Sequence, residues 1–331
     1  MNHPDRDDLR RAFLEKTGWG DASVDALPGD ASFRRYFRLG GERPAMLMDA
    51  PPPHEDVRPF IAVARHLNAL GLSAPAILAA DDDLGFAVIE DFGDATYTRL
   101  IAGGADPEPL YELAVDVLAH LHTHDDAAAI GVPPYDESRL LEEASLLVDW
   151  YRPKLLGADT PEDVRASYLA AWSDVIRNLP AGPETLVLRD YHVDNLMIVD
   201  GRDGVGRCGL LDFQDALIGH PAYDLMSLVE DARRDVPDDL RARLLERYVS
   251  MYPAARAPGF EDWFSVLAAQ RHAKVAGIFV RLLVRDGKAV YLPHVPRVVR
   301  LLKRALGAPP LAPVAAWFER HLSELGQPLP D

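Results

Sequence analysis

The sequence has almost no cysteine, fewer basic than acidic residues, and no long apolar run. Cys208 is the only cysteine among 331 residues, which excludes an internal disulfide framework and suits a reducing compartment. Lys and Arg total 35 against 52 Asp and Glu, a formal net charge of −17, which argues against a protein that wraps nucleic acid or coats an anionic membrane. No apolar stretch reaches the ~18 residues of a membrane span, and the start of the chain has no apolar core of a signal peptide. We therefore expect a soluble, cytoplasmic protein, and the sequence gives no sign of an obligate protein partner.

What is present is ordinary for a globular protein. Hydrophobic residues make up 48% and charged residues 26% of the chain, and no internal repeat is visible. The length suits one large domain or two lobes.

The first 94 residues read mainly as β-structure. Runs at 32–39, 44–50, 75–81 and 85–91 predict strands separated by turn residues. Apolar residues at helical spacing predict a helix at 5–16 and a longer one at 55–70. This part is therefore expected to be a small sheet with one main helix.

From residue 96 onward helical periodicity dominates. Helices are predicted at 107–124, 138–151, 161–179, 238–252, 261–285 and 293–306. The exception is a short β island at 184–213 with a hairpin around 201–206. The sequence thus predicts an α+β fold with an N-terminal lobe at 1–94 and a larger helical lobe at 95–331.

The β island carries an unusual concentration of polar residues. LRDYHVDN, residues 188–195, contains Asp190 and Asn195, and LLDF, residues 210–213, brings Asp212. Carboxylate and amide oxygens at neighbouring ends of a hairpin suit Mg²⁺, and a carboxylate that is not a ligand can accept a proton. The alternative is a polar hairpin whose side chains bond turn amides. Asp194 fits either interpretation.

These segments resemble the aminoglycoside and choline phosphotransferase family, which has a protein-kinase-like fold. LRDYHVDN stands where that family has H-G-D-x-H-x-x-N, and LLDFQDALIGHPAYDL stands where it has I-D-F or I-D-W followed by G-x-x-x-Y-D-L. The resemblance covers about residues 29–306. It implies ATP as the phosphate donor and Mg²⁺ as the cofactor.

The resemblance also assigns roles to residues. It implies Asp190 as the base that accepts the acceptor proton, and Asn195 and Asp212 as magnesium ligands. The remaining positions are loop supports: Asp224, Arg189 and His192.

The segments expected to bind the nucleotide match the family pattern less closely. PGDASFRRYFRL, residues 28–39, predicts a phosphate cradle formed by Gly29, Asp30, Ala31 and Ser32, with an ordinary hairpin turn as the alternative. The linker residues Glu90 and Phe92 stand where the resemblance puts the adenine. The strand lysine that kinases use is absent, because Met46, Met48 and Asp49 occupy that stretch. Either Arg34 or Arg35 replaces it, or catalysis is impaired; we favour a replacement.

The words GDASFRRYFRL, LMDAPP and QRHAKVAGIFVRL most resemble the subgroup of bacterial kinases that phosphorylate N-acetylmuramate and N-acetylglucosamine at C1 during cell-wall recycling. In the helix at 261–285, Arg271, Lys274 and Arg281 share one face and suit a substrate carboxylate. The alternative is a solvated face or ion pairs with Glu230 and Asp231.

Three rival functions remain at this stage. The first is a kinase for another alcohol, such as an aminoglycoside or choline. The second is a nucleotide-binding pseudokinase, suggested by Met48. The third is a metallohydrolase built on the Asp and His residues, to which His120 and His124 at i, i+4 spacing could contribute. We favour a structural role for these histidines.

Overall fold

The computed structural model describes residues 5–28 and 33–330 and divides into two compact units. The first unit is Met1–Val132 with Val193–Ala216, and the second is Pro133–His192 with Leu217–Asp331.

The first unit is built on a five-stranded antiparallel sheet of order β1-β2-β3-β5-β4. Its strands are β1 (Ser23–Ala26), β2 (Arg35–Gly40), β3 (Ala45–Asp49), β4 (Ile77–Asp81) and β5 (Phe86–Ile89). Its helices are α1 (Arg6–Thr17), α2 (Arg58–Ala69), α3 (Tyr97–Ala102) and α4 (Pro107–Thr123). A hairpin of β7 (Leu196–Ile198) and β8 (Cys208–Leu210) completes the unit, with the short 3₁₀ helix η2 (Gly204–Arg207) between its strands.

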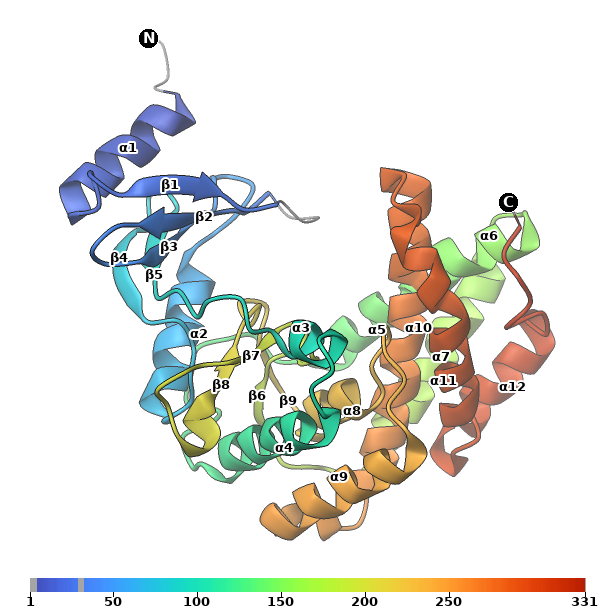
Figure 1. Cartoon of the computed structure of the whole chain (residues 1–331). Helices are drawn as coiled ribbons and strands as arrows, with labels where there is room; N and C mark the ends of the chain where they lie inside the picture. Colours follow the sequence, from blue (N-terminus) through green and yellow to red (C-terminus); the bar gives the residue numbers. More distant parts are fainter. Residues whose placement is uncertain (1–4, 29–32, 331) are drawn as a thin grey trace. The chain divides into compact units, whose positions relative to one another are not determined.

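Strand alternation gives the sheet two different faces. Phe37, Leu47 and Phe86 point to one face, where Phe13 of α1 and Trp19, which follows α1, pack on them. In Figure 1, α1 lies on one side of this sheet and α2 on the other. The second face therefore carries the alternate residues of β2 and β3.

The second unit is mainly helical, as predicted. Its helices are α5 (Glu137–Leu146), the π-helical turn η1 (Leu147–Tyr151), α6 (Arg152–Leu156), α7 (Glu162–Arg177), α8 (Ala222–Val229), α9 (Asp238–Met251), η3 (Pro253–Arg256), α10 (Phe260–Asp286), η4 (Ala289–His294), α11 (Val295–Ala305), η5 (Pro309–Leu311) and α12 (Ala312–His321). It also holds a two-stranded sheet of β6 (Thr185–Val187) and β9 (Leu217–Gly219).

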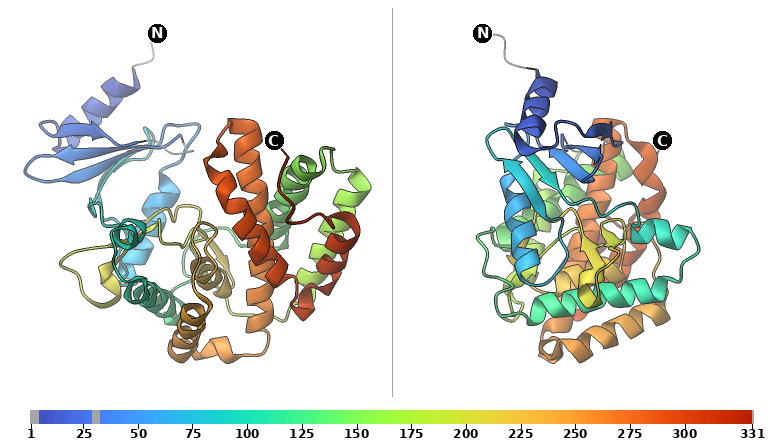
Figure 2. Two further views of the ribbon diagram at one scale, coloured as in Figure 1. Left: turned by 45° about the vertical axis from the view of Figure 1, so that its right-hand side comes forward. Right: turned by 60° about the vertical axis from the view of Figure 1, so that its left-hand side comes forward.

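The 27-residue helix α10 is the centre of this unit. It packs against α5, η1, α8 and α11, and Figure 2 shows α10 and α11 side by side. Gly277 allows a close approach to α5, because a Cβ at this position would lie 2.3 Å from the carbonyl carbon and oxygen of Leu146. A tight helix contact therefore fixes the level of α10 against α5.

The compact units divide the chain differently from the predicted lobes 1–94 and 95–331. Thr96 forms a bridge with Met197, and the N–H of Leu210 donates to the carbonyl of Ser73 at 2.7 Å, so the β7–β8 hairpin joins the first unit. Helices α3 and α4 belong to the same unit. The assignment of nucleotide binding to 1–94 and catalysis to 95–331 stays a prediction.

No helix in residues 5–28 or 33–330 is long and apolar enough to cross a membrane.

Candidate active site

A buried carboxylate from α8 holds the loop that carries Asp190. Asp224 is 0% exposed and accepts the N–H of Leu188 at 2.6 Å and the N–H of Arg189 at 2.9 Å. Burial raises the pKa of Asp224 to about 7, although these two N–H groups oppose the rise. This is the contact expected of a loop support.

The loop turns sharply at the residue before the predicted base. Arg189 has φ 71°, which is uncommon for a residue with a side chain, and the N–H of Asp190 donates to the carbonyl of Leu188 at 2.9 Å. Such backbone costs of order 1–3 kcal/mol and persists only where surrounding contacts impose it. Asp190 itself is half-buried and precedes the buried residues Tyr191 and His192.

His192, in the same loop, is buried in the second unit. It is 5% exposed, and its Nε2 lies 3.4 Å from Nη1 of Arg233. Burial lowers its pKa below the usual value. Burial thus favours the neutral ring, and the supporting role of His192 stays a prediction.

The predicted magnesium ligands meet within the first unit. Leu196 pairs with Leu210 in the β7–β8 register, and the N–H of Leu211 donates to the carbonyl of Asn195 at 3.0 Å. This pairing leaves Nδ2 of Asn195 3.4 Å from Oδ2 of Asp212. Asp212 has φ 58°, a second strained backbone at the predicted site.

The chemistry of this pair fits Mg²⁺. Asp212 is exposed, and its other carboxylate oxygen accepts Nε2 of Gln214 at 2.8 Å. Mg²⁺ is usually bound by one or two carboxylates with water and phosphate oxygens completing the octahedron, so a carboxylate beside a carboxamide is sufficient. The part of the chain that the structure describes has no group of three His, Cys, Asp or Glu side chains placed to hold a metal.

Asp194, for which the sequence left two interpretations, has a structural contact. Its carboxylate accepts the hydroxyl hydrogen of Thr98, in the first turn of α3. This bond ties the start of the hairpin to α3 and favours the structural interpretation.

The structure distinguishes the two arginines that could replace the missing lysine. Tyr36 stands opposite Met48 in the β2–β3 register, so these two residues share a face of the sheet. By strand alternation Arg34 belongs to that face, whereas Arg35 stands opposite Asp49 and points to the other face, where it is exposed. Arg34 is therefore on the side where the lysine is expected.

Arg34 is also held in place. Its Nε donates to Oε2 of Glu55 at 3.1 Å, and the two side chains are only 13% and 17% exposed. Burial alone would lower the pKa of the guanidinium, but Tyr36, Glu55 and Asp212 raise it. Arg34 and Glu55 line a cavity of about 570 Å³ that Gln214 also lines. The acid that pairs with Arg34, Glu55, lies just before α2 begins rather than within the helix.

The buried Asp49, in the same strand, is a separate structural feature. Its Oδ1 accepts Nη2 of Arg6 at 2.6 Å, and the Arg6 guanidinium lies 3.9 Å from the centre of the Phe86 ring. Asp49 therefore anchors α1 to the sheet face opposite Arg34.

The predicted adenine linker is closely packed. The N–H of Glu90 donates to the carbonyl of Ala76 at 2.9 Å, and its carboxylate accepts Nη2 of Arg202 at 2.6 Å. The ring of Phe92 lies against Gly209, where a Cβ would come within 2.8 Å of it. The Glu90 N–H is thus engaged in the sheet, and adenine recognition stays a prediction. The other predicted nucleotide residues, Gly29, Asp30, Ala31 and Ser32, lie outside the described residues.

The three basic residues of α10 have different surroundings. Nζ of Lys274 donates to Oε1 of Glu143 at 2.9 Å, so the alternative of an ion pair with Glu230 or Asp231 is wrong for this residue. Arg271 is 4% exposed, and its Nη1 is buried with no hydrogen-bond partner among residues 5–28 and 33–330. The positive charge of Arg271 lowers the pKa of His192, after the larger effect of burial.

Arg281, the last residue of the predicted basic face, is half-buried. Burial lowers its pKa, and the neighbouring Arg285 adds to this effect. Of the three residues, Arg271 is the one with both an available donor and proximity to the loop of Asp190.

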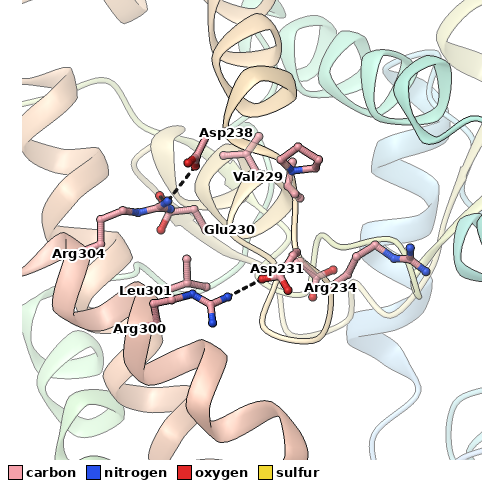
Figure 3. A pocket seen from close by; sticks show the side chains of 11 residues that line it. Val229, Glu230, Asp231, Arg234, Asp238, Arg300, Leu301 and Arg304 are labelled. Atoms are coloured by element: carbon pink, nitrogen blue, oxygen red, sulfur yellow. Dashed lines mark hydrogen bonds and ion pairs between the residues drawn. The ribbon is translucent and has the colours of Figure 1, made fainter. Parts of the chain in front are cut away.

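Glu230 belongs to a different network, next to a cavity of about 330 Å³ (Figure 3). It is 4% exposed and accepts Nε2 of His272 at 2.9 Å, Nη2 of Arg241 at 2.8 Å and Nη2 of Arg304 at 2.9 Å. Burial opposes ionisation, but His272 and the two arginines lower the pKa of Glu230 to about 2. The described residues lining this cavity do not include Asp190 or Arg271, so we do not assign it to the acceptor.

The neighbouring histidines of α4 bind backbone atoms. Nε2 of His120 lies 2.8 Å from the carbonyl oxygen of Leu70, and Nδ1 of His124 accepts the N–H of Asp126 at 3.2 Å. These contacts are those of structural histidines.

An α+β fold of this kind, with an aspartate on a supported loop and a carboxylate–carboxamide pair after neighbouring strands, is that of a protein-kinase-like phosphotransferase. Comparison with known proteins agrees with this class. The pattern of the phosphotransferase enzyme family matches residues 23–258, and the chain belongs to this family.

Two relatives match along nearly their whole length. The N-acetylmuramate/N-acetylglucosamine kinase of Caulobacter vibrioides is 36% identical over 96% of this chain and 97% of its own. The kinase of the same name from Pseudomonas aeruginosa is 38% identical over 94% of this chain and 89% of its own.

Solved structures support the fold. A choline/ethanolamine kinase family protein from Mesorhizobium loti superposes with a TM-score of 0.61 at 16% identity, covering 96% of this chain and 100% of that one. The ADP-bound aminoglycoside phosphotransferase APH(2'')-Ib gives a TM-score of 0.59 at 14% identity, covering 90% and 98%. The predicted protein-kinase-like fold is confirmed.

Proposed function

We propose that this phosphotransferase moves the γ-phosphate of ATP to the anomeric hydroxyl of N-acetylmuramate, N-acetylglucosamine or both. The observation that carries the proposal is the similarity to two kinases of these sugars over 94% or more of the chain. A cytoplasmic location, where ATP is available, and a role in cell-wall sugar recycling belong to the same proposal.

In this proposal Asp190 accepts the proton of the attacking hydroxyl as the O–P bond forms. The support for it is local: Asp224 holds the preceding backbone N–H groups, and the carboxylate of Asp190 remains partly accessible. An aspartate in this position orients the acceptor hydroxyl as well as taking its proton.

Asn195 and Asp212 are proposed to hold Mg²⁺, whose charge neutralises the phosphate oxygens during transfer. Their separation of 3.4 Å supports this role. Arg34, oriented by Glu55, is proposed to bind the phosphates in place of the strand lysine, and its proximity to Asp212 supports that assignment.

Arg271 is proposed as the residue that binds the carboxylate of N-acetylmuramate. A buried guanidinium with an uncompensated donor gains most from an anionic partner, because a charge-assisted hydrogen bond is roughly twice as strong as a neutral one. Arg281 is a weaker candidate, and Lys274 is already paired with Glu143.

The test is ³¹P NMR of the protein with ATP, Mg²⁺ and a panel of N-acetylmuramate, N-acetylglucosamine, choline and an aminoglycoside. A sugar-1-phosphate signal, with coupling to the anomeric proton, is expected for one or both amino sugars. Phosphate appearing only on choline or the aminoglycoside would overturn the substrate assignment.

A nucleotide-binding pseudokinase is the second candidate, favoured by one observation: Met48, at the lysine position, is 0% exposed and cannot bind phosphate. The same experiment separates the two functions. Tight MgATP binding without transfer to any acceptor would favour the pseudokinase.

A further inference from the structure

A single buried carboxylate in the second unit gathers four donors. Oε1 of Glu143, on α5, accepts Nη2 of Arg189 and, at 2.9 Å, Nζ of Lys274. Oε2 accepts the hydroxyl of Tyr135 and, at 3.3 Å, Nε2 of Gln270. We call these five residues the Glu143 cluster.

The cluster is buried and charged. Glu143 is 6% exposed and Lys274 9%. Burial alone would raise the pKa of Glu143, but Lys274 and Arg189 outweigh it and lower the pKa below its ordinary value. The carboxylate is therefore ionised at pH 7, and removing it would leave two cations poorly compensated in a low-dielectric interior.

One member of the cluster, Arg189, is the residue directly before the predicted base Asp190. Arg189 precedes Asp190, and its backbone is held in the left-handed region by Asp224 while its side chain is held by Glu143. The Arg189 guanidinium also lies 5.9 Å from the centre of the Tyr135 ring. Two buried carboxylates thus hold Arg189: Asp224 of α8 accepts its backbone N–H, and Glu143 of α5 accepts its side chain.

We propose that Glu143 is a positioning residue for Asp190: by holding the Arg189 side chain, it sets the direction in which the Asp190 carboxylate points. The inference rests on the proposed function, because it takes Asp190 as the base. It also gives Lys274 a role, which is to balance the charge of Glu143 rather than to bind the acceptor.

A positioning role predicts a loss of turnover in the folded enzyme, which a purely stabilising role does not predict. A loop displaced by about 1 Å costs ~100-fold in turnover, because the reacting atoms no longer meet in the productive geometry. The proposed nucleotide residues Arg34 and Asp212 belong to the other unit and are not members of the Glu143 cluster. Loss of Glu143 should therefore lower kcat and leave the KM for ATP unchanged.

The experiment compares Glu143→Gln with Glu142→Gln in the full chain. Glu142 is the adjacent residue of α5, but its side chain is 70% exposed and pairs with Arg139 on the surface, so Glu142→Gln is a matched control. Steady-state kinetics should give a kcat about 100-fold below wild type for Glu143→Gln, with an unchanged KM for ATP and normal kinetics for the control. Glu143→Asp, which keeps the charge on a shorter side chain, should restore part of the lost kcat.

Two further variants keep the test decisive. If Glu143→Gln does not fold by circular dichroism, Glu143→Gln/Lys274→Met removes one cation together with the carboxylate and restores the charge balance. Combining Glu143→Gln with Arg189→Met should lower kcat no further than the worse single variant, because both act through one side chain.

A folded Glu143→Gln or Glu143→Gln/Lys274→Met protein with wild-type kcat would overturn the positioning role while leaving the proposed function intact. Additive losses in the Arg189 combination would also overturn it. Failure of the wild-type protein to phosphorylate any acceptor would remove the proposed function and this inference together.

Discussion

Replacing Arg34 tests how this protein binds phosphate without a strand lysine. Arg34 sits on the Met48 face of the sheet and is oriented by Glu55 at 3.1 Å. In Arg34→Ala the phosphates lose a charge-assisted hydrogen bond, whereas the fold loses one partly buried ion pair. Glu55, at 17% exposed, can then be solvated, so we expect the variant to fold.

The size of the effect follows from the contact. A hydrogen bond to a charged group contributes about 1.5–3 kcal/mol, and each 1.4 kcal/mol corresponds to a tenfold change in affinity. The Kd for MgATP should therefore rise by roughly 10- to 140-fold in Arg34→Ala. Arg35→Ala, which changes an exposed residue on the opposite face, should bind MgATP about as tightly as wild type.

Isothermal titration calorimetry with MgATP measures both Kd values directly. Glu55→Gln should weaken binding less than Arg34→Ala does, because the guanidinium loses its orientation but keeps its charge. The reasoning is refuted if Arg34→Ala binds MgATP like wild type, and the two arginines exchange roles if Arg35→Ala alone loses affinity.

Four other predictions concern the remaining site and the fold. Asp190→Asn should lower kcat by about 100- to 10,000-fold and leave the calorimetric Kd for MgATP unchanged, and near-normal turnover would remove Asp190 as the base. Asp212→Asn should raise the half-saturating Mg²⁺ concentration more than ~10-fold in the kinase assay. Mutating residues that only hydrogen-bond to metal ligands already costs about that much metal affinity, and losing a ligand should cost at least as much. An unchanged Mg²⁺ dependence would contradict the ligand assignment. Arg271→Met should raise the KM for N-acetylmuramate more than that for N-acetylglucosamine, and equal changes would refute the carboxylate contact. Glu230→Gln should lower the free energy of unfolding at pH 7 by about 3 kcal/mol in urea titrations. Because the folded-state pKa of Glu230 is about 2, below its usual value, this difference should shrink as the pH falls from about 4.5 towards 2, and a difference independent of pH would contradict the ion-pair network.

The sequence predicted the elements that carry a clear local pattern. Strands β2 and β4 alternate, strands β3 and β5 are short apolar runs bounded by turn residues, and helices α4, α7, α9, α10 and α11 show helical spacing; all of these elements were confirmed. Strand β1 was missed because all four of its residues are exposed, so no apolar pattern marks it. Helix α8 was missed for the opposite reason: all eight of its residues are buried, and a helix buried on every side has no polar face.

The site shows the same limit. Asn195 and Asp212 could be paired from the sequence because a hairpin brings its two ends together. The choice between Arg34 and Arg35 could not be made, because a shift of one residue in strand register exchanges the two faces. Glu143 gave no signal at all: next to Glu142 on an amphipathic helix it looks like a solvated acid, and its partner Arg189 is 46 positions away.

Gly277 sets the position of α10, the helix proposed to bind the acceptor, relative to α5. Since the α10 backbone rests on the carbonyl of Leu146 at this residue, any side chain there would have to push α10 outward or slide it along α5. Arg271 and Lys274 belong to the same helix and would move with it, away from His192 and Glu143. A library of variants aimed at new acceptor sugars should therefore vary side chains along α10 and keep Gly277. A substitution at Gly277 would shift the helix and alter several contacts at once.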